Sequence, residues 1–346
     1  MESVTLTPLD QIKIDPWLAA LPKADLHIHQ EQSPRIDRVL ARTYGRPTYD
    51  WRGWAARLMA ENAPGADRLQ HIGVVLPDTL PADAEDATFI ARVVDLLEEA
   101  AADGALLVEA RFGNDTILRP NFMDLFREAE QQVQQRYPQL RAEALATLLL
   151  WLEPGRLERI VGGCLRMANE GLRGIDLLYQ PYDTEADWTN AYRISERAAA
   201  AGLGVTAHAG EISTANIAAA LRAPGLTRIG HATHAAADPR LLELLAQSGA
   251  TVECSLTCNV LIGAAASYDE HPIRRFVEYG IPVALCTDDP VQICTTIGRE
   301  YAIAHTLGFT PAELLGMTRN AICAAFTTST RRQALLQELD DWIFVE

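Results

Sequence analysis

Residues 204–231 read GVTAHAGEISTANIAAALRAPGLTRIGH, and this stretch decides the fold that we expect. Two short apolar runs, 204–208 and 228–231, flank a segment, 212–221, whose apolar residues recur with helical spacing. Two strands joined through a helix have the crossover connection that parallel neighbours need. The stretch therefore predicts one β–α–β unit of a parallel sheet.

The same alternation recurs on both sides of this unit. Further strands are predicted at 24–29, 105–112, 142–150, 174–178, 251–254 and 282–287. Amphipathic segments separate them, at 89–102, 122–135, 156–170, 189–201, 239–247 and 273–279. Eight strands that alternate with helices predict an α/β fold, a (β/α)8 TIM barrel, with residues 1–346 as a single domain. Residues 310–339 are predicted as further helix on the outside.

The connection 34–88 after the first strand is unusually long. It contains two helical patterns, 36–44 and 51–61, and a proline-rich turn at 77–81. An excursion after a barrel strand leaves from the C-terminal face, where the loops of a TIM barrel carry function. The sequence leaves two interpretations open, a lid over that face or a peripheral helical decoration.

Composition and charge exclude several functional classes. The 346 residues include 30 basic and 46 acidic side chains, a formal net charge of −16 at pH 7. This acidic excess argues against a nucleic-acid partner and an anionic membrane surface. No apolar run approaches the 18 residues of a membrane span, and the first 15 residues lack a signal-peptide pattern. The six cysteines have no paired spacing, which indicates reduced thiols in a cytoplasmic protein.

Polar side chains gather where the predicted strands end. His27 and His29 are two positions apart on the first strand, so both point to the same side of the sheet. His208 and His231 end two later strands, and Asp288 follows the last one. The carboxyl ends of barrel strands form one face. The sequence therefore predicts that these groups converge at one mouth.

Three imidazoles and one carboxylate suit a divalent transition metal, with zinc as the leading candidate and iron, manganese or cobalt as alternatives. With His27, His29, His208 and Asp288 as the ligands, His231 is left to hold the water molecule, although it is also a candidate ligand or base. Both lysines of the chain lie within its first 23 residues, which excludes a carboxylated lysine that bridges two metals. We expect one metal ion per chain, with an open position for water.

Glu211 lies three residues after His208, behind Ala209 and Gly210. The small neighbours let the loop turn tightly and return the carboxyl group over the site. There it would serve as the general acid that protonates a ring nitrogen when water attacks an aromatic C–N centre. The alternative is a helix-opening glutamate stabilised by the helix dipole. Asp289 is then free to accept a hydrogen bond from the substrate.

Other polar residues receive structural interpretations or none. Glu109 and Arg111 share one face of the second strand and are predicted to form an ion pair inside the barrel. Cys254 and Cys258 lack a second cysteine pair and are predicted to be core thiols. His271 has no constellation around it in the sequence, and we predict no role for it.

Several of these motifs resemble those of the adenosine deaminase family, within the amidohydrolase superfamily. The run LPKADLHIH at 21–29 resembles the opening motif of the family. Further matches follow in the same order, with VTAHAGE at 205–211, RIGH at 228–231, ECSLTCN at 253–259 and TDDP at 287–290. The resemblance extends from residue 21 to about residue 330.

The resemblance implies hydrolytic deamination of an aminopurine nucleoside or base, with release of ammonia. It implies that Glu211 protonates the purine ring at N1, that His231 orients a zinc-bound water and that Asp289 hydrogen-bonds N7. The implied zinc ligands are His27, His29, His208 and Asp288.

Two departures from the family pattern concern the substrate. Residues 30–33 read QEQS, where the family usually has Leu or Ile, then an acid, then Gly. The acid is kept as Glu31, and glutamate at this position is seen among adenine-specific relatives, whereas aspartate goes with ribose recognition. Tyr179 replaces a glycine whose backbone N–H contacts purine N3, and we expect its ring to crowd the pocket. Adenosine, adenine and related amino-heterocycles therefore all stay candidates.

Two other functions stay open from the sequence. One is a mononuclear-zinc amidohydrolase that cleaves another C–N or ester bond, and the other is a non-catalytic metal-bearing protein that binds purines. Glu211 together with Asp289 favours deamination, because the two carboxyl groups suit two ring nitrogens of one flat heterocycle. The expected partner is thus a small molecule, and the sequence does not determine the oligomeric state.

Overall fold

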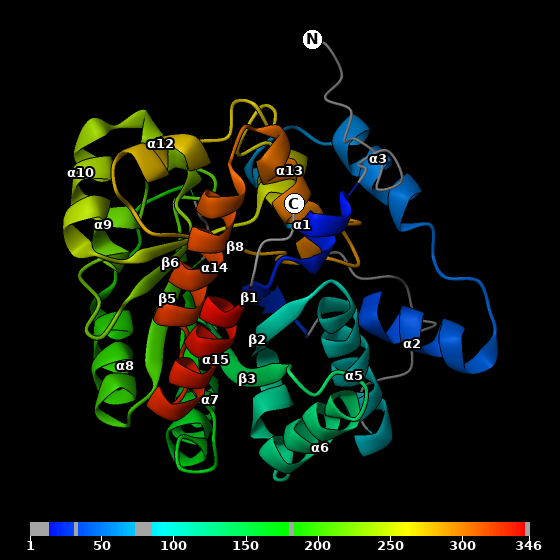
Figure 1. Ribbon diagram of the computed structural model, residues 1–346. Coiled ribbons are helices and arrows are strands. Elements are labelled where there is room, and N and C mark those ends of the chain that lie inside the picture. The colour runs from blue at the N-terminus through cyan, green and yellow to red at the C-terminus, as the bar shows by residue number, and fades with distance from the viewer. Residues whose placement is uncertain (1–13, 31–33, 73–84, 180–182, 343–346) are drawn as a thin grey trace.

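The computed structural model describes residues 14–30, 34–72, 85–179 and 183–342, in which eight parallel strands form a barrel surrounded by helices (Figure 1). The strands follow one another around the sheet in chain order. This arrangement confirms the predicted α/β barrel. The strands are β1 (Lys23–His29), β2 (Ala105–Phe112), β3 (Arg141–Leu149), β4 (Gly174–Leu178), β5 (Gly204–Ala209), β6 (Arg228–His231), β7 (Thr251–Cys254) and β8 (Val283–Leu285).

The barrel closes where β1 meets the residues that follow β8. Ile28 and Asp288 form a parallel bridge, in which the His29 N–H donates to the Asp288 carbonyl at 2.9 Å. Below it, the buried carboxylate of Asp25 accepts hydrogen bonds from the backbone N–H of Thr287 at 3.3 Å and from its hydroxyl at 2.5 Å. These contacts between β1 and residues 287–288 therefore close the sheet and place Asp288 beside the histidines of β1.

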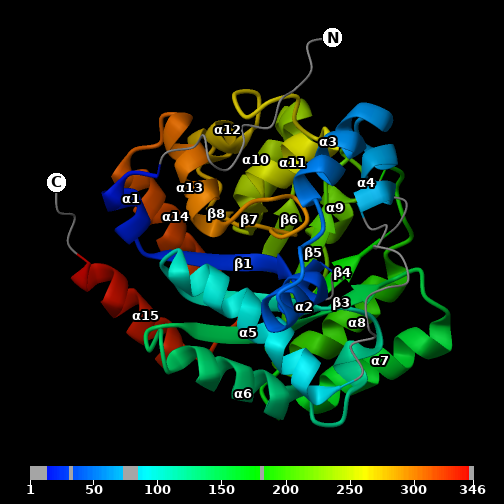
Figure 2. The same ribbon diagram turned by 90° about the vertical axis from the view of Figure 1, so that its right-hand side faces the viewer.

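Helices cover the outer surface of the sheet and pack their apolar faces on it (Figures 1 and 2). Helix α14 packs directly on β8 and β1, and α15 packs on α14. The helices outside the connection after β1 are α1 (Pro16–Ala20), α5 (Asp86–Ala102), α6 (Phe122–Gln134), α7 (Pro154–Met167), α8 (Thr189–Ala200), α9 (Ile217–Ala220), α10 (Pro239–Ser248), α11 (Leu256–Ile262), α12 (Ile273–Glu278), α13 (Ile297–Thr306), α14 (Pro311–Ala324) and α15 (Ser329–Asp341), with short 3₁₀ helices at Asn114–Leu118 and Thr233–Ala237.

The helix predicted over 310–339 is interrupted by residues 325–328, which separate α14 from α15. Phe326 lies in this break and packs against Arg228. Cζ of the Arg228 guanidinium group lies 3.7 Å from the centroid of the Phe326 ring. It also fills the space beside Gly204, where a Cβ atom would lie 2.2 Å from the Phe326 ring. The chain leaves its helical path here because this aromatic side chain packs against the strands.

Two other elements differ from the prediction because of tertiary contacts. The helix expected over 212–221 is reduced to α9, since Asn216 has a left-handed backbone with φ of 68° and its side chain accepts hydrogen bonds from Ala186 and Trp188. Helix α11 was not predicted. All seven of its residues are buried, so it has no polar face to reveal a helical period.

The connection after β1 forms α2 (Pro34–Tyr44), α3 (Trp51–Glu61) and α4 (Ala66–Ile72), while the proline-rich turn at 77–81 lies outside the described residues. Helices α3 and α4 pack beside α11 (Figure 2). There Leu58 and Ile72 join a buried cluster with Ile293, which follows β8. Part of this segment therefore contacts the loops that follow the last two strands.

The helices of the described residues do not combine the length and apolarity that a membrane crossing requires. All six cysteines are free thiols.

Candidate metal centre

Five side chains that the sequence placed at strand ends meet inside the mouth of the barrel. Nε2 of His27 lies 3.0 Å from Nε2 of His208 and 3.4 Å from Oδ1 of Asp288. Nε2 of His29 lies 3.5 Å from the same carboxylate oxygen. The imidazole of His231 is 5.2 Å from that of His208 between ring centroids, and all five side chains are buried.

Two of these residues have backbone conformations that non-glycine residues rarely adopt. His231 has φ of 63° and Asp288 has φ of 67°, both in the left-handed region. Such conformations cost about 1–3 kcal/mol each and persist where the surrounding structure imposes them. They occur here where the chain leaves β6 and where it passes β8, and they direct both side chains into the cluster.

Buried carboxylates determine which nitrogen of each ring is free. Nδ1 of His27 lies 3.0 Å from Oε2 of Glu253, and Nδ1 of His208 lies 3.0 Å from Oδ1 of Asp176. Burial by itself would raise the pKa of Glu253, but Arg111 and Arg228 outweigh it and hold that pKa well below its usual range. Arg111 likewise keeps the pKa of Asp176 low against the effect of burial. Because an ionised carboxylate can only accept, both rings donate from Nδ1.

Nε2 of His27 and Nε2 of His208 lie 3.0 Å apart. A neutral imidazole carries one proton, so with Nδ1 of each ring donating to its carboxylate, two neutral rings present unprotonated Nε2 atoms to each other. This contact is repulsive between the two rings and becomes favourable when a cation lies between them. Imidazole nitrogen and carboxylate oxygen are among the ligands that bind zinc in proteins. The donor set therefore fits a divalent transition metal.

All five side chains lie close enough to the cluster to be candidate metal ligands. The ligand atoms of His27, His208, His231 and Asp288 lie within 4.8 Å of one another, and a second such set contains His29, Asp176 and His208. Distance does not distinguish His29 from His231 as the third imidazole. The distinction comes from hydrogen bonding, which is considered below.

Glu211 returns over this cluster as expected. Gly210 has φ of 76°, and a Cβ atom there would lie 2.7 Å from Ile217, so the tight turn requires glycine. Oε1 of Glu211 lies 3.6 Å from Nε2 of His231. Burial, with the charges of Asp288 and Asp289, raises the pKa of Glu211 well above its ordinary value. The carboxyl group is thus suited to donate a proton, and it lies outside the first turn of α9, which begins at Ile217.

The three residues expected to contact substrate have different positions. Asp289 and His29 line a small cavity of about 10 Å³ that also touches Pro34 at the start of α2. The ring of Tyr179 packs on Trp188 with 5.0 Å between centroids, and its hydroxyl donates to the carbonyl of Asp187 at 2.7 Å. These contacts hold the ring against the start of α8. Glu31 lies outside the described residues.

The predicted ion pair between Glu109 and Arg111 is wrong. Arg111 reaches Oε2 of Glu253 at 2.5 Å and Oδ2 of Asp176 at 3.3 Å, while Glu109 pairs with Arg228 at 2.6 Å. Side chains two apart on a strand are parallel, and each finds its partner across the barrel instead.

Sequence analysis missed the carboxylates behind the histidines. The signal that could have revealed Asp176 and Glu253 is a single charged residue inside a short apolar strand, GIDLL at 174–178 and TVEC at 251–254. A fully buried carboxylate in such a place needs a cation or a hydrogen-bond donor nearby.

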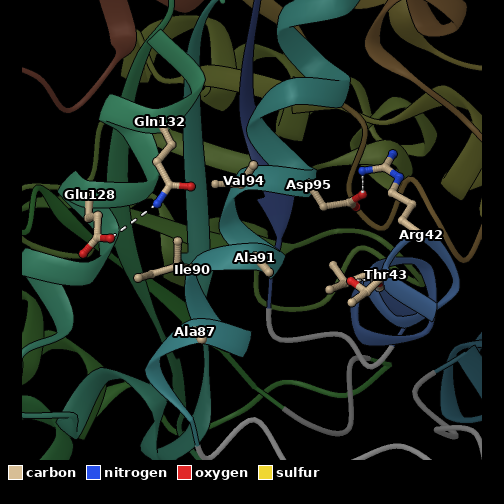
Figure 3. Close-up of a pocket in the computed structure, with 10 residues that line it drawn as sticks. Arg42, Thr43, Ala87, Ile90, Ala91, Val94, Asp95, Glu128 and Gln132 are labelled. Carbon is tan, nitrogen blue, oxygen red and sulfur yellow. Dashed lines mark hydrogen bonds and ion pairs between the residues drawn. The ribbon is translucent and has the colours of Figure 1, made fainter. Parts of the chain in front are cut away.

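A separate cavity of about 420 Å³ lies between α2, α5 and α6 (Figure 3). Its floor is apolar, with Ile90 and Val94 from α5. The polar groups around it are bound to other protein groups, since Arg42 pairs with Asp95 and the amide of Gln132 donates to Glu128. We place the chemistry at the histidine cluster, where the ligand atoms of His27, His208 and Asp288 come together.

Comparison with known proteins agrees with the motifs and the fold. A sequence model of the family described as adenosine deaminase matches residues 72–342. The chain belongs to the adenosine deaminase family. The match begins after β1, so the His-x-His pair of that strand lies outside it.

Curated relatives include an adenine deaminase from Rhizobium leguminosarum, 41% identical over 156 residues, which are 44% of this chain and 48% of the relative. An adenosine deaminase from Shewanella loihica is 41% identical over 137 residues, 39% of this chain and 41% of the relative. The chain thus spans about half the length of the curated relatives that it matches.

Solved structures with the same fold cover nearly the whole chain. The N6-mAMP deaminase from Arabidopsis has a TM-score of 0.73 with 23% identity, over 95% of this chain and all of that one. An amidohydrolase from Burkholderia ambifaria with bound Zn has a TM-score of 0.73 with 20% identity, over 96% of each chain.

Proposed function

We propose that this protein is a zinc-dependent aminohydrolase that replaces the exocyclic amine of an aminopurine, as free base or nucleoside, with oxygen and releases ammonia. The family supports this reaction class, because its curated relatives are named as adenine and adenosine deaminases. The same relatives differ in substrate, so family membership by itself does not determine the preferred aminopurine.

One observation carries the proposal. The Nε2 atoms of His27 and His208 face each other at 3.0 Å, and their Nδ1 atoms are held by buried carboxylates. We assign His27, His29, His208 and Asp288 as the ligands of one zinc ion per chain. A related fold that holds Zn supports this choice of metal. When bound, zinc supplies a water molecule whose pKa is lowered to about 7 and which attacks as a nucleophile.

The remaining residues handle protons and orient the substrate. Oxygen adds to the ring carbon that bears the amine, and Glu211 gives its proton to the adjacent ring nitrogen. His231 holds the attacking water by a hydrogen bond, and Asp289 forms a hydrogen bond with the purine. The hydroxyl proton of the adduct then passes to the amine, the C–N bond breaks, and ammonia leaves as the ring carbon becomes a carbonyl. The proton that water lost on attack restores Glu211, so that water supplies the oxygen of the product. General acid catalysis of this kind contributes about 10²- to 10⁴-fold.

The connection 34–88 is proposed to cover the mouth within a single domain. Helix α2 begins beside His29 and Asp289, and α3 and α4 pack on the helix that follows β7. Glu31 lies between His29 and α2 in the sequence and is assigned, by its match to the family motif, to substrate recognition. The six free thiols support a reducing compartment, which we take to be the cytoplasm.

The test is release of ammonia from adenine, adenosine, AMP and pterins, and of methylamine from N6-methylated adenines, by zinc-loaded protein, with metal analysis of the same sample. We expect turnover of at least one aminopurine, loss of turnover on metal removal, and one zinc per chain. Cleavage of amide or ester substrates with no ammonia release from purines would favour the other hydrolase. Tight purine binding without turnover would show that the site is not catalytic.

A further inference from the structure

A chain of buried polar side chains lies behind His231. Nδ2 of Asn259, on α11, is 3.1 Å from Nδ1 of His231, and Oδ1 of Asn259 is 3.1 Å from both Nε2 of His271 and Oγ1 of Thr233. All four side chains are buried. None of the contacts involves the atoms that face the metal centre.

The direction of these hydrogen bonds is determined at one end by the backbone. The N–H of Ile273 can only donate, and it lies 3.2 Å from Nδ1 of His271, so that nitrogen accepts. Burial lowers the pKa of His271 to about 3, which keeps the ring neutral with its single proton on Nε2. His271 therefore donates from Nε2 to the carbonyl oxygen of Asn259.

The orientation of the Asn259 amide then determines the state of His231. With its oxygen accepting from His271 and Thr233, the amide directs its N–H group at Nδ1 of His231, which must accept. The single proton of a neutral His231 is thus on Nε2. A doubly protonated ring would place an N–H of His231 against an N–H of Asn259.

The surroundings of Nε2 agree with this assignment. Oε1 of Glu211 lies 3.6 Å and Oδ2 of Asp288 lies 3.9 Å from this nitrogen. Neither lies within hydrogen-bond distance, so in the part of the chain that is described Nε2 of His231 is a buried atom without a hydrogen bond. An N–H at this nitrogen is favourable beside the ionised carboxylate of Asp288, whereas a lone pair there would be repelled by it.

We propose that Asn259, oriented by His271, is a positioning residue that holds the proton of His231 on Nε2, so that His231 faces the centre as a hydrogen-bond donor and neither as a metal ligand nor as a base. Only the kinetic consequences of this proposal rest on the function proposed above. The group that contacts Nδ1 distinguishes the imidazoles. A carboxylate that accepts from Nδ1 of His27 or His208 leaves Nε2 of a neutral ring unprotonated, whereas the amide N–H at Nδ1 of His231 leaves its Nε2 protonated.

The direct test is the ¹⁵N NMR spectrum of the histidine rings in zinc-loaded protein, with His231 assigned from His231→Gln. We expect a neutral ring protonated at Nε2. In Asn259→Asp the carboxylate accepts at Nδ1, and we expect the proton to move there. A wild-type His231 protonated at Nδ1, or with the shift of a metal-bound Nε2, would overturn the proposal whether or not any substrate is known.

Two variants of His271 test whether this residue orients the Asn259 amide. They also keep the proposal falsifiable when Asn259→Asp does not fold. Both His271→Gln and His271→Leu remove the acceptor of the Ile273 N–H, but only glutamine retains a donor toward Asn259. We expect His271→Gln to preserve the Nε2 proton and His271→Leu to give a mixture of both ring forms. Identical spectra in the two variants would show that His271 does not orient Asn259.

Kinetics on an aminopurine that the enzyme turns over give the second readout. A histidine in the wrong tautomer costs a serine protease about 10⁴-fold in kcat. Here we expect Asn259→Asp to lose at least about 10²-fold in kcat with little change in KM and zinc content, and His271→Gln to stay within a few-fold. Equal losses in the two His271 variants, tracking their Tm, would indicate a purely structural role. Absence of turnover by wild type would contradict the proposed function and leave the NMR result to stand by itself.

Discussion

Replacing Glu211 by glutamine is the most informative perturbation of the proposed chemistry. The carboxyl group is 3% exposed, and burial beside Asp288 and Asp289 raises its pKa well above the ordinary value, which favours the protonated form. An amide has nearly the shape of a protonated carboxyl group. We therefore expect Glu211→Gln to leave the fold and the zinc content unchanged.

We expect Glu211→Gln to slow the chemical step of the reaction. A general acid contributes about 10²- to 10⁴-fold, which corresponds to about 2.7–5.4 kcal/mol of activation free energy. The assay is single-turnover ammonia release by zinc-loaded protein, together with the Kd of the product. We expect the rate to fall within that range while product affinity stays within a few-fold.

Asp289→Asn is the matched comparison, because it changes a neighbouring carboxyl group that we assign to substrate binding. It should raise KM more than it lowers kcat. A Glu211→Gln variant within a few-fold of wild type, or one that loses its zinc, would refute the assignment of Glu211 as the acid.

Three other predictions concern the metal, the substrate and acid stability. His208→Ala removes one of four ligands and should sharply lower zinc content measured after dialysis; one zinc per chain with unchanged affinity would show that the ligands are misassigned. Tyr179→Gly should raise activity on adenosine relative to the preferred substrate, and a native kcat/KM for adenosine of about 10⁶ M⁻¹s⁻¹ or more would refute it. The pKa of His271 is lowered to about 3 from about 6.5 in the unfolded chain, so the unfolded chain binds more protons between these values and stability falls as pH falls. In urea unfolding of metal-free protein, wild type should lose about 2 kcal/mol more than His271→Gln between pH 7 and pH 5, and equal losses would contradict the buried neutral ring.

Much of the barrel could be predicted because strand and helix periods are local properties. Strands β2, β4, β6 and β7 have the predicted bounds, and helices near 36–44 and 51–61 were expected. Two of the misses share a cause. Asn216 breaks a helix to bind Ala186 and Trp188, and Phe326 breaks another to pack on Arg228, contacts that no local pattern reveals.

By itself the sequence determined which side chains reach the mouth of the barrel. His27 and His29 share a face because strand residues alternate, and parallel strands in chain order deliver His208, His231 and Asp288 to the same end. These are consequences of backbone geometry, which a short segment specifies.

Only the tertiary structure decided what each imidazole can do there. The ring states depend on partners far along the chain, such as Glu253 at Nδ1 of His27, 226 positions away, and Asn259 at Nδ1 of His231. Three histidines with similar sequence signals thus become two unprotonated nitrogens that fit a metal and one N–H donor. A proton on a buried ring goes to the nitrogen whose neighbour accepts it, and those neighbours are brought together only when the barrel closes.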